Sequence, residues 1–447
     1  ICTFLFLLGV SFGYFIIAYV LLPVYYRFNV TSIYQYLEMR YGKRSQVSGS
    51  VLFLVSRSLG AAIRLSLMAI ILHNFVFAKL MPGTADAMGH VNGAFPVWLT
   101  VLIILGMIYA YTFKGGIKTI IWTDTLQTTL LLLTIIVSVV MVKNLLHQGW
   151  GEITSTLVHS RITDLFPNGF LGKDSFVELF VSGVFLTVGM TGLDQAMMQR
   201  SLSARNVRDA QKNLLTFSWI IVVINFLLLC TGAMLSLYLT NNNITLAKTD
   251  NMFFQVATNA FGVIAGTIFI LGFAASTFSS SDDAMTAITT SFAVDFLKWD
   301  DNRPEWQRKV LHAGVALFLF FIIVTVCQNL KGAAIDNVLL VASYTYAPLL
   351  GMFFFGVSTR KKVKDVYVTA IAILTPIITV VYNMFKGIDY VLDHMDMMPN
   401  DFLSYDIFNR VLFYVSKGNG NITIVYSAIL SMVLLYLASL VTNQELE

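Results

Sequence analysis

Long apolar stretches alternate with short polar segments along the whole chain. Eleven stretches are close to the roughly 20 residues that a helix needs to cross the hydrocarbon core of a bilayer. They cover residues 1–26, 47–78, 96–113, 117–145, 176–198, 214–240, 258–294, 309–328, 338–357, 365–386 and 421–442. Only 12% of the residues are charged and 57% are hydrophobic, whereas a soluble globular protein carries about 25% charged residues. The pattern therefore predicts an all-α, polytopic membrane protein.

The basic residues predict the orientation of these spans. Every second loop is rich in Lys and Arg, as in the segments from Arg27 to Arg44 and from Arg200 to Lys212. Such loops remain on the cytoplasmic side of a membrane. We therefore expect residue 1 outside and Glu447 inside, in the plasma or inner membrane of a cell. The basic residues indicate topology and not a nucleic-acid surface.

The segment 258–294 carries oxygen-bearing side chains in the middle of an apolar stretch. At helical spacing, three hydroxyls and one carboxylate share one face of the helix: Ser276, Ser279, Ser280 and Asp283. Asp282 flanks this face. Carboxylates at this depth are costly unless the protein uses them. Hard oxygens away from bulk water suit a sodium ion or a proton. Close helix packing, with the aspartates paired elsewhere, would explain the serines but not two adjacent carboxylates, so a cation site is favoured.

Two arginines lie seven residues apart in the second span and therefore face the same way. Arg64 is expected near the middle of the membrane. There it either pairs with an intramembrane aspartate or meets an anionic substrate. Arg57 lies nearer the cytoplasmic face, where pairing or snorkelling is the favoured interpretation.

Two further polar positions mark the fourth and fifth spans. Asp124 lies deeper than a helix-start carboxylate normally does, so it is a candidate partner of the aspartates in 258–294. Asp194 and Gln195 follow a stretch rich in Gly and Thr, where a helix can break and expose ligand-binding groups. A flexible helix end before a basic loop is the alternative there.

Five segments resemble the sodium:solute symporter family, which includes sodium–glucose, proline, sialic acid and iodide transporters. They read YTFKGGIKTIIWTDTLQ, DQAMMQRSLSARNVRDAQK, ASTFSSSDDAMTAITTSFAVDF, SYTYAPLLGMFFFG and SIYQYLEMRYG. The resemblance implies a leucine-transporter-like (APC) fold with two inverted five-helix repeats. It makes 1–447 a single transmembrane domain, with 1–145 in the first repeat, 176–357 in the second and 358–447 as peripheral helices. It also places the first core helix upstream of residue 1.

The resemblance also assigns site residues. The general sodium site of the family falls on Ser276, Ser279 and Ser280. A second sodium site, present in some members, falls on Asp124, Ser279, Asp282 and Asp283. Carboxylates replace hydroxyls found in some members, so the second site is either a stronger sodium site or a proton site. In sialic acid transporters of the family an arginine on the third core helix binds the substrate carboxylate, and Arg64 lies on the corresponding helix.

The sequence thus predicts a symporter that imports a small organic solute with one or two sodium ions by alternating access. Arg64, Asp194 and Gln195 are the candidate substrate residues. A carboxylate-bearing sugar acid such as sialic acid is favoured over a neutral sugar or polyol. A sensor that keeps the symporter fold and an uncoupled channel remain alternatives. No catalytic constellation is visible, so we do not expect an enzyme. The partners expected are sodium, the solute and the lipid bilayer.

Overall fold

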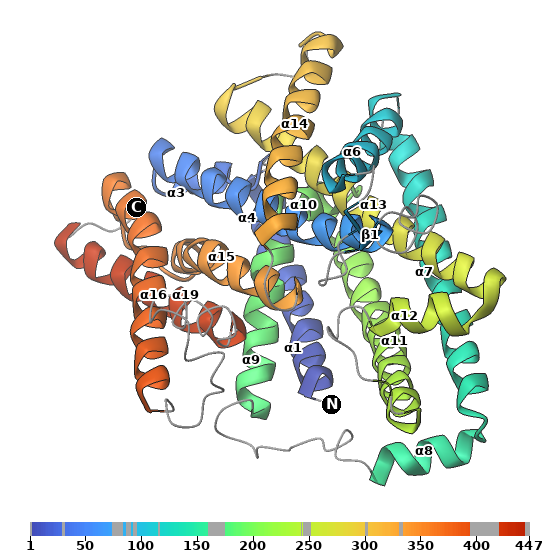
Figure 1. The fold of residues 1–447 in the computed structure, drawn as a ribbon. Helices are drawn as coiled ribbons and strands as arrows, with labels where there is room; N and C mark the ends of the chain where they lie inside the picture. Colours follow the sequence, from blue (N-terminus) through green and yellow to red (C-terminus); the bar gives the residue numbers. More distant parts are fainter. Residues whose placement is uncertain are drawn as a thin grey trace.

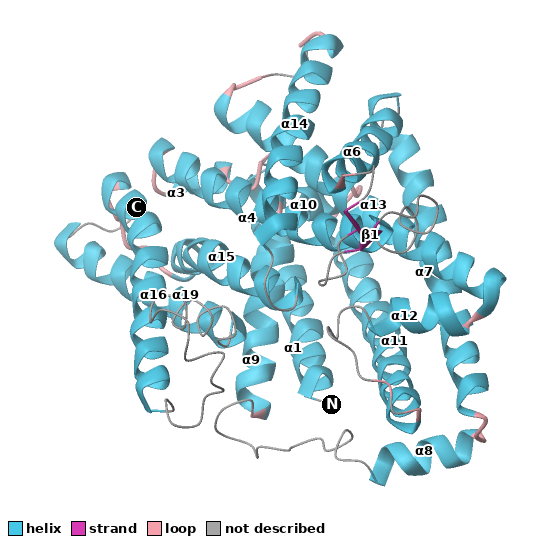
Figure 2. Cartoon of the chain, in the orientation of Figure 1, coloured by secondary structure: helices cyan, strands magenta, loops and turns pink. Residues whose placement is uncertain are grey.

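The computed structural model describes most of the chain and shows an almost entirely helical molecule (Figures 1 and 2). The described residues are 2–28, 32–73, 84–85, 91–92, 96–114, 117–159, 175–242, 244, 252–299, 303–329, 334–393 and 420–442. Their one sheet is a pair of antiparallel two-residue strands, β1 (Thr84–Ala85) and β2 (Val91–Asn92).

The helices of the first half are α1 (Cys2–Ile16), η1 (Ile17–Leu21), α2 (Leu22–Phe28), α3 (Gln35–Arg40), α4 (Lys43–Leu72), α6 (Val97–Lys114), α7 (Ile117–Leu146) and α8 (Trp150–His159). Those of the second half are α9 (Phe176–Thr187), η4 (Val188–Gly192), α10 (Gln195–Leu202), α11 (Val207–Asn241), α12 (Met252–Ala260), α13 (Gly262–Ser291), η6 (Phe292–Phe296), α14 (Glu305–Asn329), α15 (Ala334–Ser358), α16 (Asp365–Asp393) and α19 (Gly420–Thr442). The segments η1, η4 and η6 are short π-helices.

In the described part of the chain, each of the eleven predicted spans lies on helix; residues 74–78 of the second predicted span lie outside the described residues. Among the described residues, nine helices are long and apolar enough to cross a membrane, and one bent pair adds a tenth span. The predicted span 96–113 is α6, whose apolar part, Val97–Ala110, is shorter than the others. The long segment 258–294 is not one straight helix, because the chain turns between α12 and α13 at Gly262, where φ is +77°.

The helix α4 lies at the centre of the molecule (Figure 1) and packs against α13, α14, α15 and α16. The helix α13 packs against both α4 and α7. This arrangement places the oxygen-rich face of α13 next to the two helices that carry Arg57, Arg64 and Asp124. The polar residues predicted from four separate segments therefore share one region of the fold.

The helices α1 and α9 run side by side with their backbones in close contact (Figure 1). Glycines make this approach possible. A Cβ atom on Gly9 would lie 2.0 Å from the carbonyl oxygen of Phe180, and one on Gly183 would lie 2.3 Å from that of Phe6. Because glycine has no side chain, the two helices can approach until their backbones are in van der Waals contact.

The helix α9 continues into η4, and the chain then bends by 69° before α10. The Gly- and Thr-rich stretch had predicted a break at this place. Two buried tyrosine hydroxyls satisfy carbonyls that the bend frees: Tyr25 donates to Gly192 O at 3.0 Å, and Tyr34 donates to Leu193 O at 2.8 Å. Because unsatisfied backbone groups are very costly inside a bilayer, these tyrosines stabilise the broken helix.

The turn between α3 and α4 is held by hydrogen bonds to the end of α15 and the start of α16. Gly42 has φ +130°, a conformation that favours glycine. Asp365 accepts hydrogen bonds from the backbone of Arg44 and Ser45 at 2.9 and 2.8 Å and so caps the start of α4. Arg40 donates to the carbonyls of Gly356, Thr359 and Lys361. The central helix α4 is therefore anchored at its first turn.

Candidate functional site: a polar cavity between α4, α7, α10 and α13

A polar cavity of about 290 Å³ lies where four helices meet. Its wall on α13 consists of the predicted oxygen face, and α4 supplies the two arginines from the opposite side. The lining residues are Arg57, Arg64, Gln127, Thr128, Leu131, Met197, Ser276, Ser279, Ser280 and Asp283. Helical spacing explains the set on α13, because positions three, four and seven apart project from one side of a helix.

A chain of polar contacts joins α7, α13 and α10 at the edge of this cavity. Ser279 donates a hydrogen bond of 2.9 Å to Asp124 Oδ1. The other oxygen, Asp124 Oδ2, lies 3.0 Å from a terminal nitrogen of Arg200, and the same nitrogen contacts Asp283 Oδ1. The structure thus brings Asp124, Ser279 and Asp283 together and adds Arg200, which the sequence analysis treated only as a topology signal.

Asp282 occupies a different environment from its neighbour. Its side chain is 1% exposed and does not line the cavity. Thr286, one turn further along α13, lies 3.5 Å from Oδ1, while Oδ2 has no hydrogen-bond partner among the described residues. Successive residues of a helix project about 100° apart, so the two adjacent carboxylates face different neighbours.

Arg57 and Asp194 form a buried ion pair of 3.2 Å between α4 and the bend. Asp194 is fully buried and also accepts hydrogen bonds from the backbone of Ala196 and Met197, so it caps α10. The hydroxyl of Tyr346 donates to its second oxygen at 3.4 Å. The pairing favoured for Arg57 is therefore observed. The carboxylate of Asp194, a predicted substrate residue, is occupied by contacts within the protein.

Gln195 lies on the far side of the same turn. Its side-chain oxygen accepts a hydrogen bond of 3.0 Å from the backbone of Ile33, and the residue is 1% exposed. It is not among the residues that line the cavity. Its contacts fasten the start of α10 to the segment before α3.

Arg64 lines the cavity without an ion pair to any described residue. Its Nε atom is buried and has no hydrogen-bond partner in the described part of the chain, and the same holds for Gln127 Oε1 across the cavity. Of the two outcomes open for Arg64 in the sequence, pairing with an intramembrane aspartate is thus not what the described residues show. Its guanidinium faces the cavity instead.

A sequence model of the sodium:solute symporter family matches residues 1–365. The chain belongs to this family.

Known relatives of this symporter-family chain transport different solutes, according to their names. The sodium-dependent multivitamin transporter of Oryctolagus cuniculus is 32% identical over 201 residues, which are 44% of this chain and 29% of that protein. The sodium/sialic acid symporter of Aliivibrio fischeri is 24% identical over 363 residues, which cover 76% of this chain and 66% of that protein. The sodium-coupled monocarboxylate transporter 1 of Mus musculus is 24% identical over 384 residues, which cover 78% of this chain and 57% of that protein. The chain thus spans less than two thirds of the length of these relatives.

A solved structure shows the same fold as this symporter-family chain. It is a sodium-coupled sialic acid symporter in a substrate-bound, outward-open state, with a TM-score of 0.72 and 17% sequence identity. The likeness covers 98% of this chain and 83% of that one. The predicted leucine-transporter-like, all-helical membrane fold is confirmed. The expectation of a transporter is supported by membership of the sodium:solute symporter family and not by the fold.

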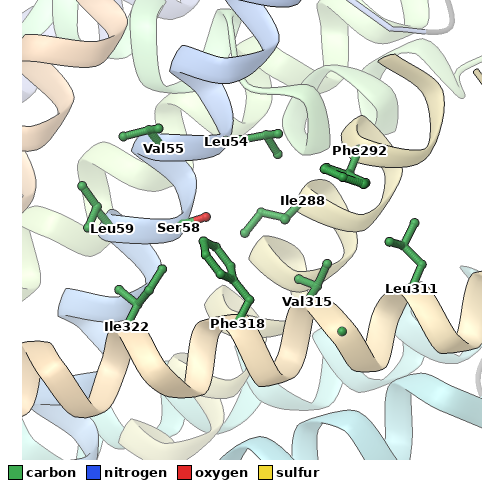
Figure 3. A pocket seen from close by; sticks show the side chains of 11 residues that line it. Leu54, Val55, Ser58, Leu59, Ile288, Phe292, Leu311, Val315, Phe318 and Ile322 are labelled. Atoms are coloured by element: carbon green, nitrogen blue, oxygen red, sulfur yellow. The ribbon is translucent and has the colours of Figure 1, made fainter. Parts of the chain in front are cut away.

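A second cavity in this symporter-family chain has the opposite character. It measures about 490 Å³ and lies between α4, α13 and α14 (Figure 3). Figure 3 shows Leu54, Val55, Phe318 and other apolar side chains around it, with Ser58 contributing the one hydroxyl among its lining residues. The helix α4 therefore borders one polar and one apolar space.

Sequence reasoning missed Arg200, Gln127 and Tyr346. Each comes from a segment that already carried a prediction. The contacts of Arg200 with Asp124 and Asp283 span 76 and 83 residues, and that of Tyr346 with Asp194 spans 152 residues. Gln127 offered a local signal, because it lies three residues after Asp124 and so on the same side of α7. Within the described residues no group of three or more His, Cys, Asp or Glu side chains could hold a metal ion. The oxygen face of α13 is a different kind of site, built largely from hydroxyls.

Proposed function

We propose that this protein is a sodium-coupled symporter that imports a small organic anion by alternating access. One observation carries the proposal: a single cavity contains both a cluster of hard oxygens on α13 and, across from it, the guanidinium of Arg64. The oxygens suit a monovalent cation and the guanidinium suits a carboxylate. A cavity with both features would place a cation and an anion close enough for the binding of one to favour the other, which is a direct route to coupled transport.

The sodium ions would bind at the α13 face. Ser276, Ser279 and Ser280 contribute hydroxyl oxygens to the first proposed site, and all three line the cavity. Asp124 and Asp283 are the carboxylates of the second. The hydrogen bond from Ser279 on α13 to Asp124 on α7 supports this second site, because it brings side chains of both helices together. Asp282, which has an unpartnered oxygen in the described structure, is the candidate for a proton in place of the second sodium.

The solute would bind at Arg64. Since Arg57 is neutralised by Asp194, Arg64 is the lining arginine whose charge is not paired with a described residue. Sialic acid and monocarboxylates, which the names of two relatives specify, are both carboxylates at neutral pH. The cavity volume of about 290 Å³ is at the small end of ligand pockets, which measure roughly 300–1,000 Å³. These points favour a carboxylate-bearing solute such as a sugar acid over a neutral sugar or polyol.

The bent pair of α9 and α10 provides the moving part of the proposed cycle. Ions and solute shift the equilibrium between two conformations of the protein toward the one that they bind more tightly. The size of the shift is set by the difference between their affinities for the two conformations. The halves 1–145 and 176–357 would be the inverted repeats. Packing is in keeping with this division, because α4 of the first half and α13 of the second lie against each other and both line the cavity. Residue 1 would be outside and Glu447 inside.

The test is solute uptake into proteoliposomes that contain the full-length protein, driven by an inward sodium gradient. Ser279→Ala removes one cavity hydroxyl and should abolish the sodium dependence. Ser281→Ala is the matched control, since Ser281 lies on the same helix but bonds its own backbone at Thr277 O. Arg64→Ala should abolish uptake of carboxylates while Arg205→Ala, an exposed arginine outside the cavity, leaves it intact.

Two results would contradict the proposal. Uptake that responds neither to sodium nor to Ser279→Ala would favour an uncoupled channel or a sensor with a symporter fold. Sodium-driven uptake of neutral sugars that is indifferent to Arg64→Ala would keep the symport and exclude the anionic solute.

A further inference from the structure

The guanidinium of Arg200 occupies the position between two carboxylates where the second sodium ion would bind. One terminal nitrogen contacts both Asp124 Oδ2 on α7 and Asp283 Oδ1 on α13. Asp124 in turn accepts the hydrogen bond from Ser279. A sodium ion coordinated by these two carboxylates would need the place that this nitrogen fills.

The exposure of the three side chains indicates which one can leave. Arg200 is 48% exposed, whereas Asp124 is 22% and Asp283 15% exposed. Two ionised carboxylates this close together and largely shielded from water repel each other, and a cation between them relieves that repulsion. The arginine, with its head near water, can swing out and be hydrated, while the carboxylates are fixed in membrane helices.

Arg200 also connects the helix after the bend to this site. It lies on α10, the short helix after the 69° bend. Met197, three residues earlier, lines the polar cavity, so one face of α10 is directed toward the site. The start of α10 is held by Asp194 and Arg57. Towards the other end of α10, Arg200 contacts Asp124 on α7 and Asp283 on α13.

We propose that Arg200 is a tethered cation that alternates with sodium on Asp124 and Asp283, so that sodium entry releases the end of α10. This inference rests on the sodium site proposed above and adds a coupling between that site and the bent helix. Arg200 holds the carboxylates together and α10 closed when sodium is low. Sodium displaces the guanidinium, neutralises the same carboxylates and leaves α10 free to move.

The first experiment measures binding of radioactive sodium to the purified full-length protein without solute. If the site is free of Arg200 for about a tenth of the time, the apparent affinity for sodium is about tenfold weaker than the intrinsic one. Arg200→Gln should therefore bind sodium about tenfold more tightly, and Arg200→Lys should remain close to the native protein. Arg205→Gln, an exposed arginine in the turn after α10, is the matched control and should change nothing.

The second experiment separates displacement from a simple effect of nearby charge. Met198 is fully buried on α10, so its replacement by cysteine reports opening of this helix. In a chain whose native cysteines are replaced by alanine, sodium should accelerate thiol labelling of Met198→Cys, and potassium should not. Labelling at Met285→Cys, fully buried on α13, should not respond. Adding Arg200→Gln to Met198→Cys should make labelling fast without sodium.

Each outcome decides the matter. Unchanged or weaker sodium binding by Arg200→Gln, with uptake still dependent on Ser279, would overturn the tethered cation but keep the symporter. Labelling of Met198→Cys that ignores sodium would overturn the release of α10, and this measurement does not depend on whether Arg200→Gln folds. Loss of all dependence on Ser279 and Asp124 would instead remove the proposed function itself.

Discussion

Arg57 and Asp194 lie almost entirely out of water, and each depends on the other for neutralisation. Their side chains are 12% and 0% exposed, and their atoms are 3.2 Å apart. Breaking a buried ion pair by removing one partner costs about 3–5 kcal/mol, because the remaining charge is left unpaired. Removing both partners at once can be nearly neutral.

This asymmetry gives a prediction at the scale of single residues. Arg57→Met should lower the free energy of unfolding by about 3–5 kcal/mol. Asp194→Asn together with Arg57→Met should recover part of the loss, because asparagine keeps a capping oxygen for α10 and no lone charge remains. Thermal unfolding in detergent, followed by size-exclusion chromatography after heating, measures both. A double variant less stable than Arg57→Met would show that the ion pair is not what stabilises the bend.

Arg64 and Arg57 differ in their partners: Arg57 pairs with Asp194, and Arg64 has no ion pair with a described residue. Both were placed on one face of the second span by their spacing of seven residues, and both line the cavity. Spacing within one helix was enough to put them there. It could not say which arginine meets Asp194, because that depends on the path of a segment more than a hundred residues later in the chain.

At the scale of helices, the contact between α1 and α9 includes a close approach of the two backbones at Gly9 and Gly183. Gly183→Val places methyl groups where the carbonyl of Phe6 would already be 2.3 Å from a Cβ atom. Overpacking normally costs about 1–3 kcal/mol, and here rigid backbone is the obstacle, so we expect the upper end of that range. The thermal midpoint in detergent should fall accordingly.

The control for this prediction is Gly232→Val. Gly232 lies on α11, and a Cβ atom there would meet nothing within 4 Å. Its replacement adds the same side chain without a collision. A loss of stability equal to that of Gly183→Val would mean that valine itself, and not the close contact of α1 with α9, is harmful.

The sequence predicted helices well and the contacts between them poorly. A bilayer admits only segments whose backbone bonds are satisfied internally, so hydropathy alone located each span, and the Gly- and Thr-rich stretch located the bend. The face of α13 followed from helical spacing. Arg200 was overlooked because a basic loop residue has an adequate explanation in topology. Its contact with Asp283 exists only once α10 turns back toward α13.

At the scale of the whole molecule, sodium binding should stabilise the folded protein. A ligand that binds only the native state adds RT ln(1 + [L]/Kd), about 1.4 kcal/mol when sodium is ten times its Kd. We therefore expect a higher thermal midpoint in sodium chloride than in choline chloride at the same ionic strength. The increase should disappear in Ser279→Ala and persist in Ser281→Ala. An equal increase in both salts would point to a general effect of ionic strength.

The helices α1 and α9 change character at the same level. Each passes from α-helix to π-helix, at η1 and η4, and these two short segments lie in contact with one another. A π-helical turn is wider and interrupts the regular ladder of hydrogen bonds. The two interruptions therefore lie side by side between helices that are packed together through glycines. We expect a tilt of α1 or α9 to bend the chain at this shared position, because the regular hydrogen-bond ladder is interrupted in both helices there.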